Sequence, residues 1–337
     1  MPLIRYLHQV TAREHLSFEQ AREAMTVLLE GRAAESQIGA FLVALKMKGE
    51  TADELAGFAR AMRDHMIEVE AGQGLVDTSG TGGDDSGTFN ISTVAAIVMA
   101  GAGAKVAKHG NRSLATQSGS ADVLEALGIR IALTPEEAGT AIREIGLGFL
   151  FAPNLHPAMR HAQPVRQAIK MRTAFNLIGP LANPARAQSQ LIGAASLETA
   201  WLMAEALHRL GTHRSFVVHG HDGLDEISTT GPTAVFEVSA QGVQRHTWTA
   251  HTFGLNSASK LELKGGDAAQ NAQIAREILA GEKGPKREIV LANAAAGLLA
   301  AGLAASLEEG VLQAAKAIDD GSAEAVLSRL TKAFPAR

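Results

Sequence analysis

Four glycines fall within residues 80–87, the glycine loop, which lies between a strand-like apolar run and a helix-like apolar run. Glycine lets the backbone take a positive φ and lets the oxygens of a ligand approach main-chain N–H groups. Asn90, Ser92 and Thr93 follow at the expected start of the next helix, where backbone donors and the positive end of the helix dipole are available. This combination suits an anion, most commonly phosphate. The alternative is an ordinary strand-to-helix turn, which rarely needs four glycines.

The glycine loop departs from two well-known phosphate loops. Asp85 stands where a G-x-G-x-x-G dinucleotide fingerprint has its third glycine. Gly82 and Gly87 have the separation of a Walker A loop, but Thr88 stands in place of its lysine. The loop therefore indicates a phosphate cradle of another kind.

A basic turn follows the next expected strand. Lys108, His109 and Arg112 come directly after it and are surrounded by small hydroxyl residues. In open parallel sheets, ligands bind beyond the carboxyl ends of the strands. Two cations among many donors suit a phosphate ester, although a solvated basic turn is the alternative. A lone histidine is more often structural than catalytic, so we assign His109 a positioning role only.

Two adjacent carboxylates, Asp225 and Glu226, follow a third expected strand. Hard oxygen ligands of this kind bind Mg²⁺, which bridges to phosphates, whereas a charged surface loop would explain the pair equally well. His219 and His221 alternate on one strand face and could resemble a metal-binding pair. Because no third soft ligand accompanies them, zinc is not expected.

A fourth candidate is an arginine that could grip a carboxylate. Arg166 lies in a helix-prone stretch, and a guanidinium forms a bidentate fork with a carboxylate group. Arg172 is its rival for this role, and structural ion pairs would account for both residues.

The elements that position these residues fall into two regions. Residues 1–70 show only helical patterns, with capping boxes that begin at Ser17 and Thr51. From residue 74 onward, short apolar runs alternate with helical stretches, which predicts an α/β fold with a mostly parallel central sheet. We expect a helical domain at 1–70, completed by a polar, helix-prone insert near 155–186, and an α/β domain at 74–337. Expected strands are 75–78, 104–107, 190–194, 215–219 and 233–238, and expected helices are 92–102, 120–127, 134–145, 197–210 and a packed Ala-rich helix within 288–305.

Composition limits the class of protein. The chain has 337 residues, 46% of them hydrophobic, and a formal net charge of -4, without the basic excess of a nucleic-acid binder. It has no cysteine, which excludes disulfides and thiolate catalysis. Its most apolar stretch lies within 294–305, well short of the ~20 residues that span a membrane. No signal-peptide pattern opens the sequence, so we expect a cytoplasmic protein without membrane or nucleic-acid partners.

Together these segments resemble the anthranilate phosphoribosyltransferase family, of the nucleoside-phosphorylase-like class, over nearly the whole chain. Several such segments in one order are specific, whereas any one alone would be weak. The segments that carry the resemblance are Gly80-Thr81-Gly82-Gly83-Asp84, Asn90-Ile91-Ser92-Thr93, Lys108-His109-Gly110-Asn111-Arg112-Ser113, Ser118-Gly119-Ser120-Ala121-Asp122, Arg172-Thr173, Phe175-Asn176, Gly179-Pro180-Leu181 and Gly223-Leu224-Asp225-Glu226.

The resemblance implies transfer of phosphoribose from 5-phosphoribosyl diphosphate to the amino group of anthranilate, by a homodimer formed through the helical domain. It implies two Mg²⁺ ions bound by Ser92, Asp225 and Glu226, and anthranilate bound by Gly80, Asn111 and Arg166. The residues that would bind the sugar diphosphate are Gly80, Gly83, Asp84, Thr88, Asn90, Ile91, Ser92, Thr93, Lys108, His109, Gly110, Asn111, Arg112, Ser113, Leu114, Ala115, Thr116 and Ser120.

Two other functions share the expected fold. A pyrimidine nucleoside phosphorylase would bind inorganic phosphate without a paired acidic site, and Asp225-Glu226 argues against it. A non-catalytic relative that holds nucleic acid conflicts with the net charge of -4. One departure from the family is visible: Lys170 stands where the family commonly has glycine, which leaves the acceptor side less defined than the phosphate side.

Overall fold

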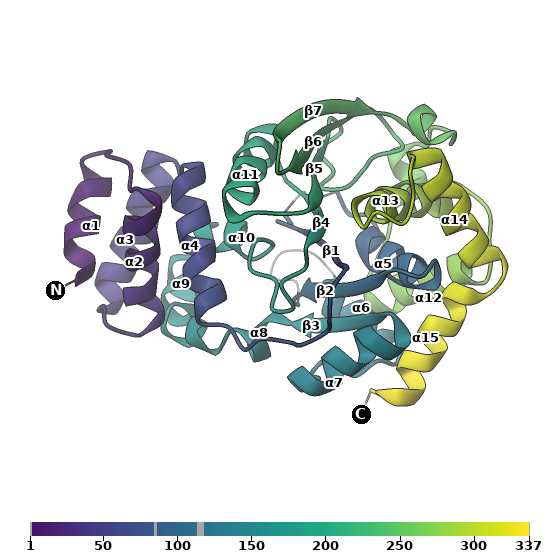
Figure 1. Cartoon of the computed structure of the whole chain (residues 1–337), viewed down its shortest axis with the longest axis horizontal. Coiled ribbons are helices and arrows are strands. Elements are labelled where there is room, and N and C mark those ends of the chain that lie inside the picture. Colours follow the sequence, from purple (N-terminus) through teal and green to yellow (C-terminus); the bar gives the residue numbers. More distant parts are fainter. Residues whose placement is uncertain (1, 84–85, 113–117, 337) are drawn as a thin grey trace.

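The computed structural model describes residues 2–83, 86–112 and 118–336. Four helices form one end of the molecule, on the left of Figure 1. The Ser17 and Thr51 side chains each accept a hydrogen bond from the third backbone N–H of the following helix, which satisfies donors that a helix start leaves open. The four helices are α1 (Pro2–Thr11), α2 (Phe18–Leu29), α3 (Glu35–Lys48) and α4 (Ala52–Asp64).

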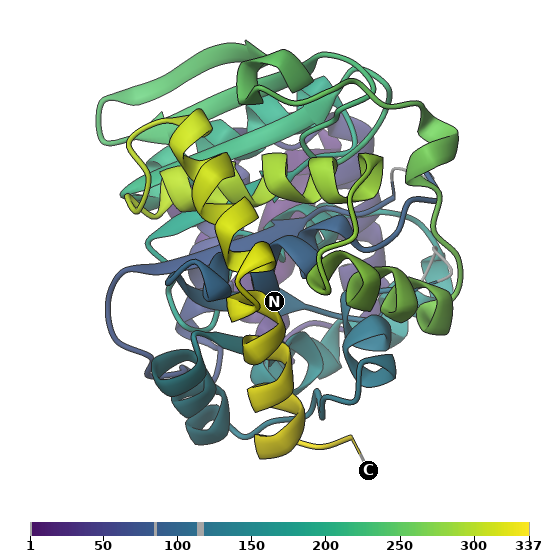
Figure 2. The same cartoon turned by 90° about the vertical axis from the view of Figure 1, so that its right-hand side faces the viewer.

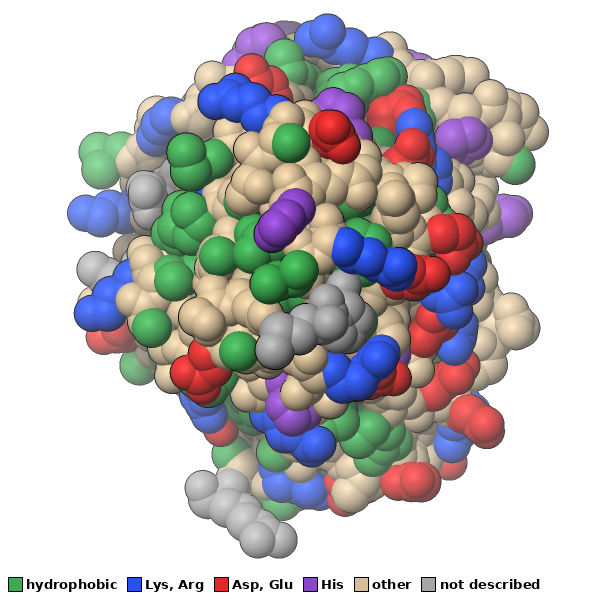
Figure 3. Space-filling model, turned by 90° about the vertical axis from the view of Figure 1, so that its left-hand side faces the viewer, with side chains coloured by type: hydrophobic (Ala, Val, Ile, Leu, Met, Phe, Trp, Pro, Cys, Tyr) green, Lys and Arg blue, Asp and Glu red, His purple; other side chains and the backbone are tan. Residues whose placement is uncertain are grey.

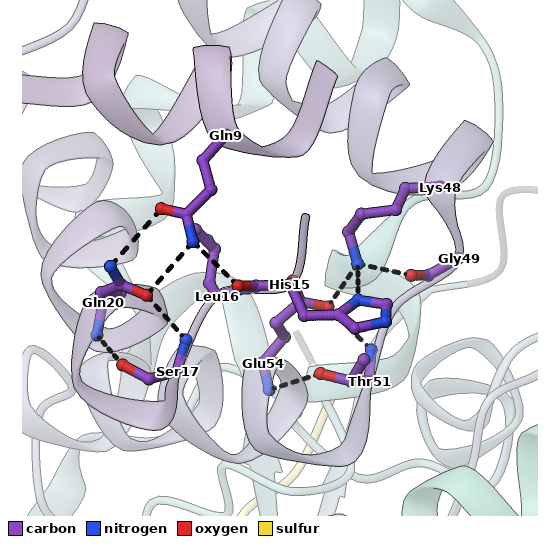
Figure 4. A network of polar contacts seen from close by, with 9 residues as sticks. All are labelled: Gln9, His15, Leu16, Ser17, Gln20, Lys48, Gly49, Thr51 and Glu54. Atoms are coloured by element: carbon purple, nitrogen blue, oxygen red, sulfur yellow. Dashed lines mark hydrogen bonds and ion pairs between the residues drawn. The ribbon is translucent and has the colours of Figure 1, made fainter. Parts of the chain in front are cut away.

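A buried ion pair joins the end of α3 to the start of α4 (Figure 4). Lys48 Nζ lies 2.9 Å from Glu54 Oε2, and the two side chains are only 2% and 0% exposed. Glu54 also accepts hydrogen bonds from the Thr51 and Leu16 N–H groups, at 2.8 and 2.9 Å. Removing one partner would leave an uncompensated buried charge, so the pair fixes how the two helices meet.

The centre of the molecule is a seven-stranded sheet. The first five strands in sequence are parallel to one another, and β6 and β7 add an antiparallel edge. Strands β2 and β3 lie on one side of β1, and β4 and the later strands lie on its other side. The order of strands therefore reverses between β1 and β4. The spatial order is β3 (Leu147–Phe151), β2 (Lys105–Gly110), β1 (Leu75–Gly80), β4 (Ser189–Gly193), β5 (Arg214–Gly220), β6 (Thr233–Ser239) and β7 (Gly242–Trp248).

Helices cover both faces of the sheet. Helices α5 (Ile91–Gly101) and α13 (Pro285–Ala300) pack on one face, and α14 (Leu307–Asp319) and α15 (Ser322–Ala333) lie outside them, as Figure 2 shows. On the other face, α11 (Leu197–Leu210) packs between the sheet and α4. Side chains of one strand alternate between these two cores, as expected for a period of two.

The remaining helices lie in the connections between the strands and helices already named. Within the insert, α9 contacts α3, and α10 contacts α4. None of the described helices is both long enough and apolar enough to cross a bilayer. The remaining elements are α6 (Ser120–Ala126), α7 (Pro135–Thr140), the π-helical turn η1 (Ala141–Ile145), α8 (Ala152–Leu155), η2 (Pro157–His161), α9 (Gln163–Ile169), α10 (Ala174–Ile178), η3 (Ala250–Phe253), η4 (Lys260–Leu263) and α12 (Ala268–Leu279).

The α/β class with a mostly parallel sheet is confirmed, and the elements differ from expectation in a few places. Strand β3 was not predicted, because its five residues form a continuous apolar run without alternation. Strand β7 was not predicted either, because it is an edge strand of mixed polarity. The helix expected at 134–145 is α-helical only to Thr140 and then widens into η1. The Ala-rich helix α13 ends at Ala300 rather than near 305.

Helix α9 ends in a left-handed residue that is not glycine. Lys170, the residue that departs from the family pattern, has φ 47° and ψ 39° and donates its N–H to Arg166 O at 3.2 Å. Glycine takes this conformation without steric cost, whereas the Cβ of any other L-residue approaches the following carbonyl. A glycine, which the family resemblance leads us to expect at this position, would take this conformation without that cost.

This conformation predicts that Lys170→Gly stabilises the protein by about 1 kcal/mol, since glycine removes the left-handed penalty but adds freedom to the unfolded chain. The free energy of unfolding from urea titration checks this. Lys170→Ala is the matched control: it removes the charge but keeps the Cβ, so it should give no gain. Equal stabilisation by both variants would show that the charge, not the backbone, is responsible.

Candidate functional site

A cleft of about 880 Å³ opens beyond the carboxyl ends of β1 and β2 and reaches the helical end of the molecule. One wall carries the glycine loop, the start of α5, the basic turn and the acidic pair. The opposite wall comes from α4, η2, α9 and α10. Described residues of every predicted motif therefore meet in one cavity, at the sheet edge where the strand order reverses, which is where open α/β sheets bind ligands.

Asp225 lies directly against the ends of β1 and β4. A Cβ on Gly193 would stand 1.5 Å from Asp225 O, and one on Gly80 would stand 2.8 Å from Asp225 Oδ2. Only glycine at 193 leaves room for the backbone of this segment, whereas a Cβ at 80 would press on the Asp225 carboxylate. Asp225 Oδ2 then accepts a hydrogen bond from the Gly82 N–H at 3.0 Å. The carboxylate is thereby tied to the glycine loop, far from it in sequence.

Glu226 is tied to the start of α5 in the same way. Its Oε1 accepts a hydrogen bond from the Ser92 N–H at 3.1 Å, one of the donors that a helix start leaves open. The structure thus brings Ser92, Asp225 and Glu226 to one side of the cleft. Two carboxylates and a hydroxyl are hard oxygen donors that suit Mg²⁺. Within the described residues, no group of three His, Cys, Asp or Glu forms a closed metal cage, so further ligands would come from substrate or water.

Lys108 extends from β2 toward the start of α5. Its Nζ donates to Thr78 O at 2.6 Å and lies 3.4 Å from Ser92 Oγ. The side chain is buried, and burial lowers the pKa of Lys108 while the nearby carboxylates of Asp77 and Glu226 act in the opposite direction. Lys108 therefore joins Thr78 on β1 to Ser92 at the start of α5.

The buried carboxylate of Asp77 lies between β1 and β2 and binds the backbone of β2. Asp77 Oδ1 accepts the His109 N–H at 3.0 Å, and Asp77 Oδ2 accepts from Asn183 Nδ2 at 2.9 Å. The same Asn183 Nδ2 donates to Ala107 O at 2.8 Å. Burial raises the pKa of Asp77 to about 6, although the hydrogen bonds and the charge of Lys108 oppose this. Side chains thus replace the strand ladder at the point where the basic turn begins.

His109 pairs with a histidine from the opposite wall. His109 Nε2 and His156 Nε2 are 3.2 Å apart, and both rings are buried. Burial is the largest cause that lowers the pKa of His109 to about 3 and that of His156 to about 4. The neighbouring His156 and Lys108 lower the pKa of His109 further. Both rings are therefore neutral near pH 7, consistent with a positioning role for His109.

The rest of the basic turn is held by α6. Asn111 O accepts a hydrogen bond from Ser120 Oγ at 3.3 Å. Gly110 leaves no room for a Cβ, because that atom would stand 2.4 Å from Ser120 Oγ. Arg112 is exposed and pairs with Asp122 and Glu125, at 2.8 and 2.6 Å. These carboxylates raise the pKa of Arg112, so its guanidinium remains charged beside the cleft.

Asn90 links three segments of the wall that carries the glycine loop, called the donor wall below. Its Nδ2 donates to Ser118 O at 3.1 Å, and its Oδ1 accepts from Asn271 Nδ2 at 2.9 Å. Thr88 forms an isolated antiparallel bridge with Lys264, which lines the cleft but was not predicted. The available signal was the run Lys264-Gly265-Gly266 directly before a helix capping box, a pattern typical of a loop that approaches a ligand.

The other predicted residues are placed as follows. Ile91 and Thr93 lie in the first turn of α5 and are buried, so their contribution to a ligand site would come from the backbone. Gly83 lies at the cleft with φ 77°. Asp84, Ser113, Leu114, Ala115 and Thr116 lie outside the described residues.

Arg166 faces the cleft from α9. Its guanidinium carbon lies 5.2 Å from the centre of the Phe175 ring, and its Nη1 lies 3.4 Å from Gln163 Oε1. Burial lowers the pKa of Arg166. Among the acidic residues of the described chain, none forms an ion pair with it. A mostly buried arginine that faces a cavity without a carboxylate partner suits a ligand that brings its own carboxylate.

Arg172 does not share this position. Its Nη2 donates to Thr81 O at 3.0 Å, on the donor wall. The two arginines that the sequence offered as rivals therefore serve different halves of the cleft.

Comparisons with known proteins agree with these features. Residues 72–324 match a family described as glycosyl transferase family, a/b domain, and residues 4–66 match its helical bundle domain. An anthranilate phosphoribosyltransferase of Solibacter usitatus is 56% identical over 333 residues, covering 98% of each chain. One of Symbiobacterium thermophilum is 50% identical over 96% of this chain and 95% of its own length.

Solved structures have the same fold. Anthranilate phosphoribosyltransferase from Thermus thermophilus superposes with a TM-score of 0.92 and 44% identity, covering 97% of this chain and 98% of that one. The enzyme from Saccharomyces cerevisiae in complex with PRPP and Mg gives a TM-score of 0.89 with 27% identity, covering 98% and 97%. A third structure, of the yeast enzyme with 4-fluoroanthranilate, gives 0.88 with 26% identity over the same shares.

The histidine pair predicts how stability depends on pH. Unfolded histidine titrates near about 6.5, above the folded values, so the unfolded state takes up protons first as the pH falls and stability is lost. At about pH 5 each buried histidine should lower the free energy of unfolding by about 2 kcal/mol relative to neutral pH. His156→Phe should remove about half of the loss that the two histidines cause together, as measured by urea titration at both pH values. His251→Phe, at an exposed site, should leave the loss unchanged; an unchanged loss in His156→Phe would contradict the assignment.

Proposed function

The chain belongs to the anthranilate phosphoribosyltransferase family, whose members transfer the phosphoribosyl group of 5-phosphoribosyl diphosphate to anthranilate in tryptophan biosynthesis, and we propose that it performs this transfer within the cleft. The observation that carries the proposal is the division of one cavity. Donors for a phosphate and ligands for a metal line one wall, and Arg166 faces them from the other. A sugar diphosphate needs hydrogen-bond donors and metal ligands, and an aromatic carboxylate needs a cation such as Arg166.

The donor wall binds the sugar diphosphate through backbone N–H groups. The glycine loop and the start of α5 supply these donors, and the turn around Asn111 supplies further polar groups. Negative charge builds on the departing diphosphate during the transfer. Fixed donors and the positive charge of Lys108 and Arg112 stabilise it without reorganisation at the moment of reaction.

Ser92, Asp225 and Glu226 are proposed to hold two Mg²⁺ ions. The oxygen chemistry of this set fits Mg²⁺, and a yeast relative is described with PRPP and Mg. When bound, Mg²⁺ neutralises phosphate charge and helps the diphosphate to leave. Hydrogen bonds from the Gly82 and Ser92 N–H groups orient both carboxylates for that task.

The acceptor wall binds anthranilate through its carboxylate. Arg166 provides a bidentate fork, and Phe175 beneath it restricts where the guanidinium can lie. A yeast relative is described in complex with 4-fluoroanthranilate, a carboxylate of this class. The arylamine is neutral near pH 7, so attack needs no strong general base. This fits a cleft whose buried histidines, His109 and His156, are neutral.

We also propose a cytoplasmic homodimer that contacts through the helical domain, residues 1–70 with the insert 155–186, while residues 74–337 form the α/β domain. The end of the molecule that the four N-terminal helices form carries hydrophobic side chains among its polar ones (Figure 3). Two of the exposed hydrophobic residues are Ile4 on α1 and Met47 on α3, which are 38% and 72% exposed. These neighbouring helices offer apolar area for a second copy.

The purified protein should consume anthranilate, seen as loss of its fluorescence, when 5-phosphoribosyl diphosphate and Mg²⁺ are supplied. Turnover should depend on Mg²⁺, because the two carboxylates are proposed to act through the metal. A folded protein without turnover would contradict the proposed function.

The matched variant for this assay replaces both Asp225 and Glu226 by Ala. It should lose most activity together with the dependence on Mg²⁺. Full Mg²⁺-dependent turnover in the double variant would contradict the metal site while leaving the reaction itself in place.

Arg166→Ala should raise the KM for anthranilate by at least about 30-fold, which corresponds to about 2 kcal/mol for a lost charged partner. Binding of the sugar diphosphate, measured by calorimetry, should stay near that of the wild type. Arg166→Lys keeps the charge but not the fork, so it should fall between the two. If Arg166→Ala instead lost binding of the sugar diphosphate, the assignment of Arg166 to the anthranilate carboxylate would be wrong.

A further inference from the structure

Arg172 lies across the glycine loop in a space that a side chain would fill. A Cβ on Gly83 would stand 1.9 Å from Arg172 Nη1, and Arg172 Nη2 donates to Thr81 O at 3.0 Å. Gly83 has φ 77°, so its backbone favours glycine as well. The planar guanidinium is thus seated on the loop backbone by both a hydrogen bond and a close approach.

The loop is anchored on its other side by the sheet and the acidic pair. The Thr81 N–H donates to Gly193 O at 2.9 Å, and the Gly82 N–H donates to Asp225 Oδ2 at 3.0 Å. Arg172 therefore supplies the contact that reaches the same loop from the insert carrying the acceptor wall. The loop lies between the strand ends and this arginine.

Arg172 and Arg166 belong to one short, tightly bonded segment. The Lys170 N–H donates to Arg166 O, which closes the end of α9. Thr173 then begins α10, and its N–H donates to Asn176 Oδ1 at 3.0 Å. The two arginines are therefore joined by one short stretch of backbone, with the left-handed turn at Lys170 between them.

We propose that Arg172 is a positioning residue that couples the carboxylate site at Arg166 to the glycine loop, so that each substrate tightens the binding of the other. This inference rests on the proposed function. Anthranilate fixes α9 through Arg166, and Arg172 then holds the loop in the form that binds the sugar diphosphate. The coupling is reciprocal, since linkage requires the same factor in both directions.

The test measures binding of 5-phosphoribosyl diphosphate with Mg²⁺ by calorimetry, with and without saturating benzoate. Benzoate carries the carboxylate but no amino nucleophile, so no reaction follows. In the wild type, benzoate should tighten the sugar diphosphate by about 5-fold or more, a typical coupling. Arg172→Gln should abolish the tightening while still binding the sugar diphosphate alone. Arg172→Lys keeps one charged donor and should retain part of it.

Two controls separate coupling from a general loss of structure. Arg329→Gln removes another arginine that donates to a backbone carbonyl, that of Glu144 outside the cleft, and should keep the full tightening. Arg166→Ala should lose the tightening because benzoate loses its partner. Full tightening in Arg172→Gln, or none in the wild type, would overturn the proposal.

Two further outcomes are also decisive. Complete loss of sugar diphosphate binding in folded Arg172→Gln would make Arg172 a direct ligand and overturn the positioning role. If that variant does not fold, full wild-type tightening in Arg172→Lys would overturn the proposal, and partial tightening would support it. Failure of the proposed function is seen separately, as a wild type that binds but never consumes anthranilate.

Discussion

The site depends on how closely the segment carrying Asp225 approaches the ends of β1 and β4. A Cβ on Gly193 would stand 1.5 Å from Asp225 O, so the approach exists only because the strand ends in glycine. From this position Asp225 reaches the Gly82 N–H, and Glu226 reaches the Ser92 N–H. One segment therefore fixes both the glycine loop and the start of α5. The reversal of strand order creates the crevice, and this contact turns it into a site with charge on a defined wall.

A second constraint is the charge buried beneath that wall. An isolated lysine or aspartate would be costly in this environment, and each would shift its pKa rather than stay ionised. Here Asp77 and Glu226 lie near Lys108, and Thr78 O accepts from its ammonium. Asp77 is held in turn by Asn183 and the His109 N–H. Buried groups of this kind stabilise little by themselves, but they define one arrangement of the strand ends from which the basic turn begins.

The sequence alone predicted the parts of the site that consist of contiguous residues. It did not predict the parts that depend on contacts between residues far apart in the chain. The glycine loop and the acidic pair follow apolar strands. Strand β2 runs on to Gly110 rather than ending at 107, so Lys108 and His109 lie on the strand itself. The rule for carboxyl ends of parallel strands nevertheless brings the three segments together. Nothing in the chain pattern showed that Asn271 holds Asn90, because the two are far apart in sequence and joined only by a side-chain bond. The two arginines near α9 could not be separated either. Their division depends on which wall each guanidinium reaches, and this follows from contacts distant in sequence, such as that of Arg172 with Thr81 O.

The two walls also differ in how firmly they are held, and this bears on specificity. The donor wall is cross-linked by backbone and side-chain bonds from β1, β4, α5 and α12. The acceptor wall combines α4 with the short helices η2, α9 and α10, and Arg166 contacts Gln163 at 3.4 Å and the face of Phe175. A cationic His109 between the walls would compete with Arg166 for a carboxylate. Burial keeps that histidine neutral, so it adds no competing positive charge to the cleft at neutral pH. In the proposed function, the firmly held donors bind the leaving group and Arg166 binds the carboxylate of the acceptor.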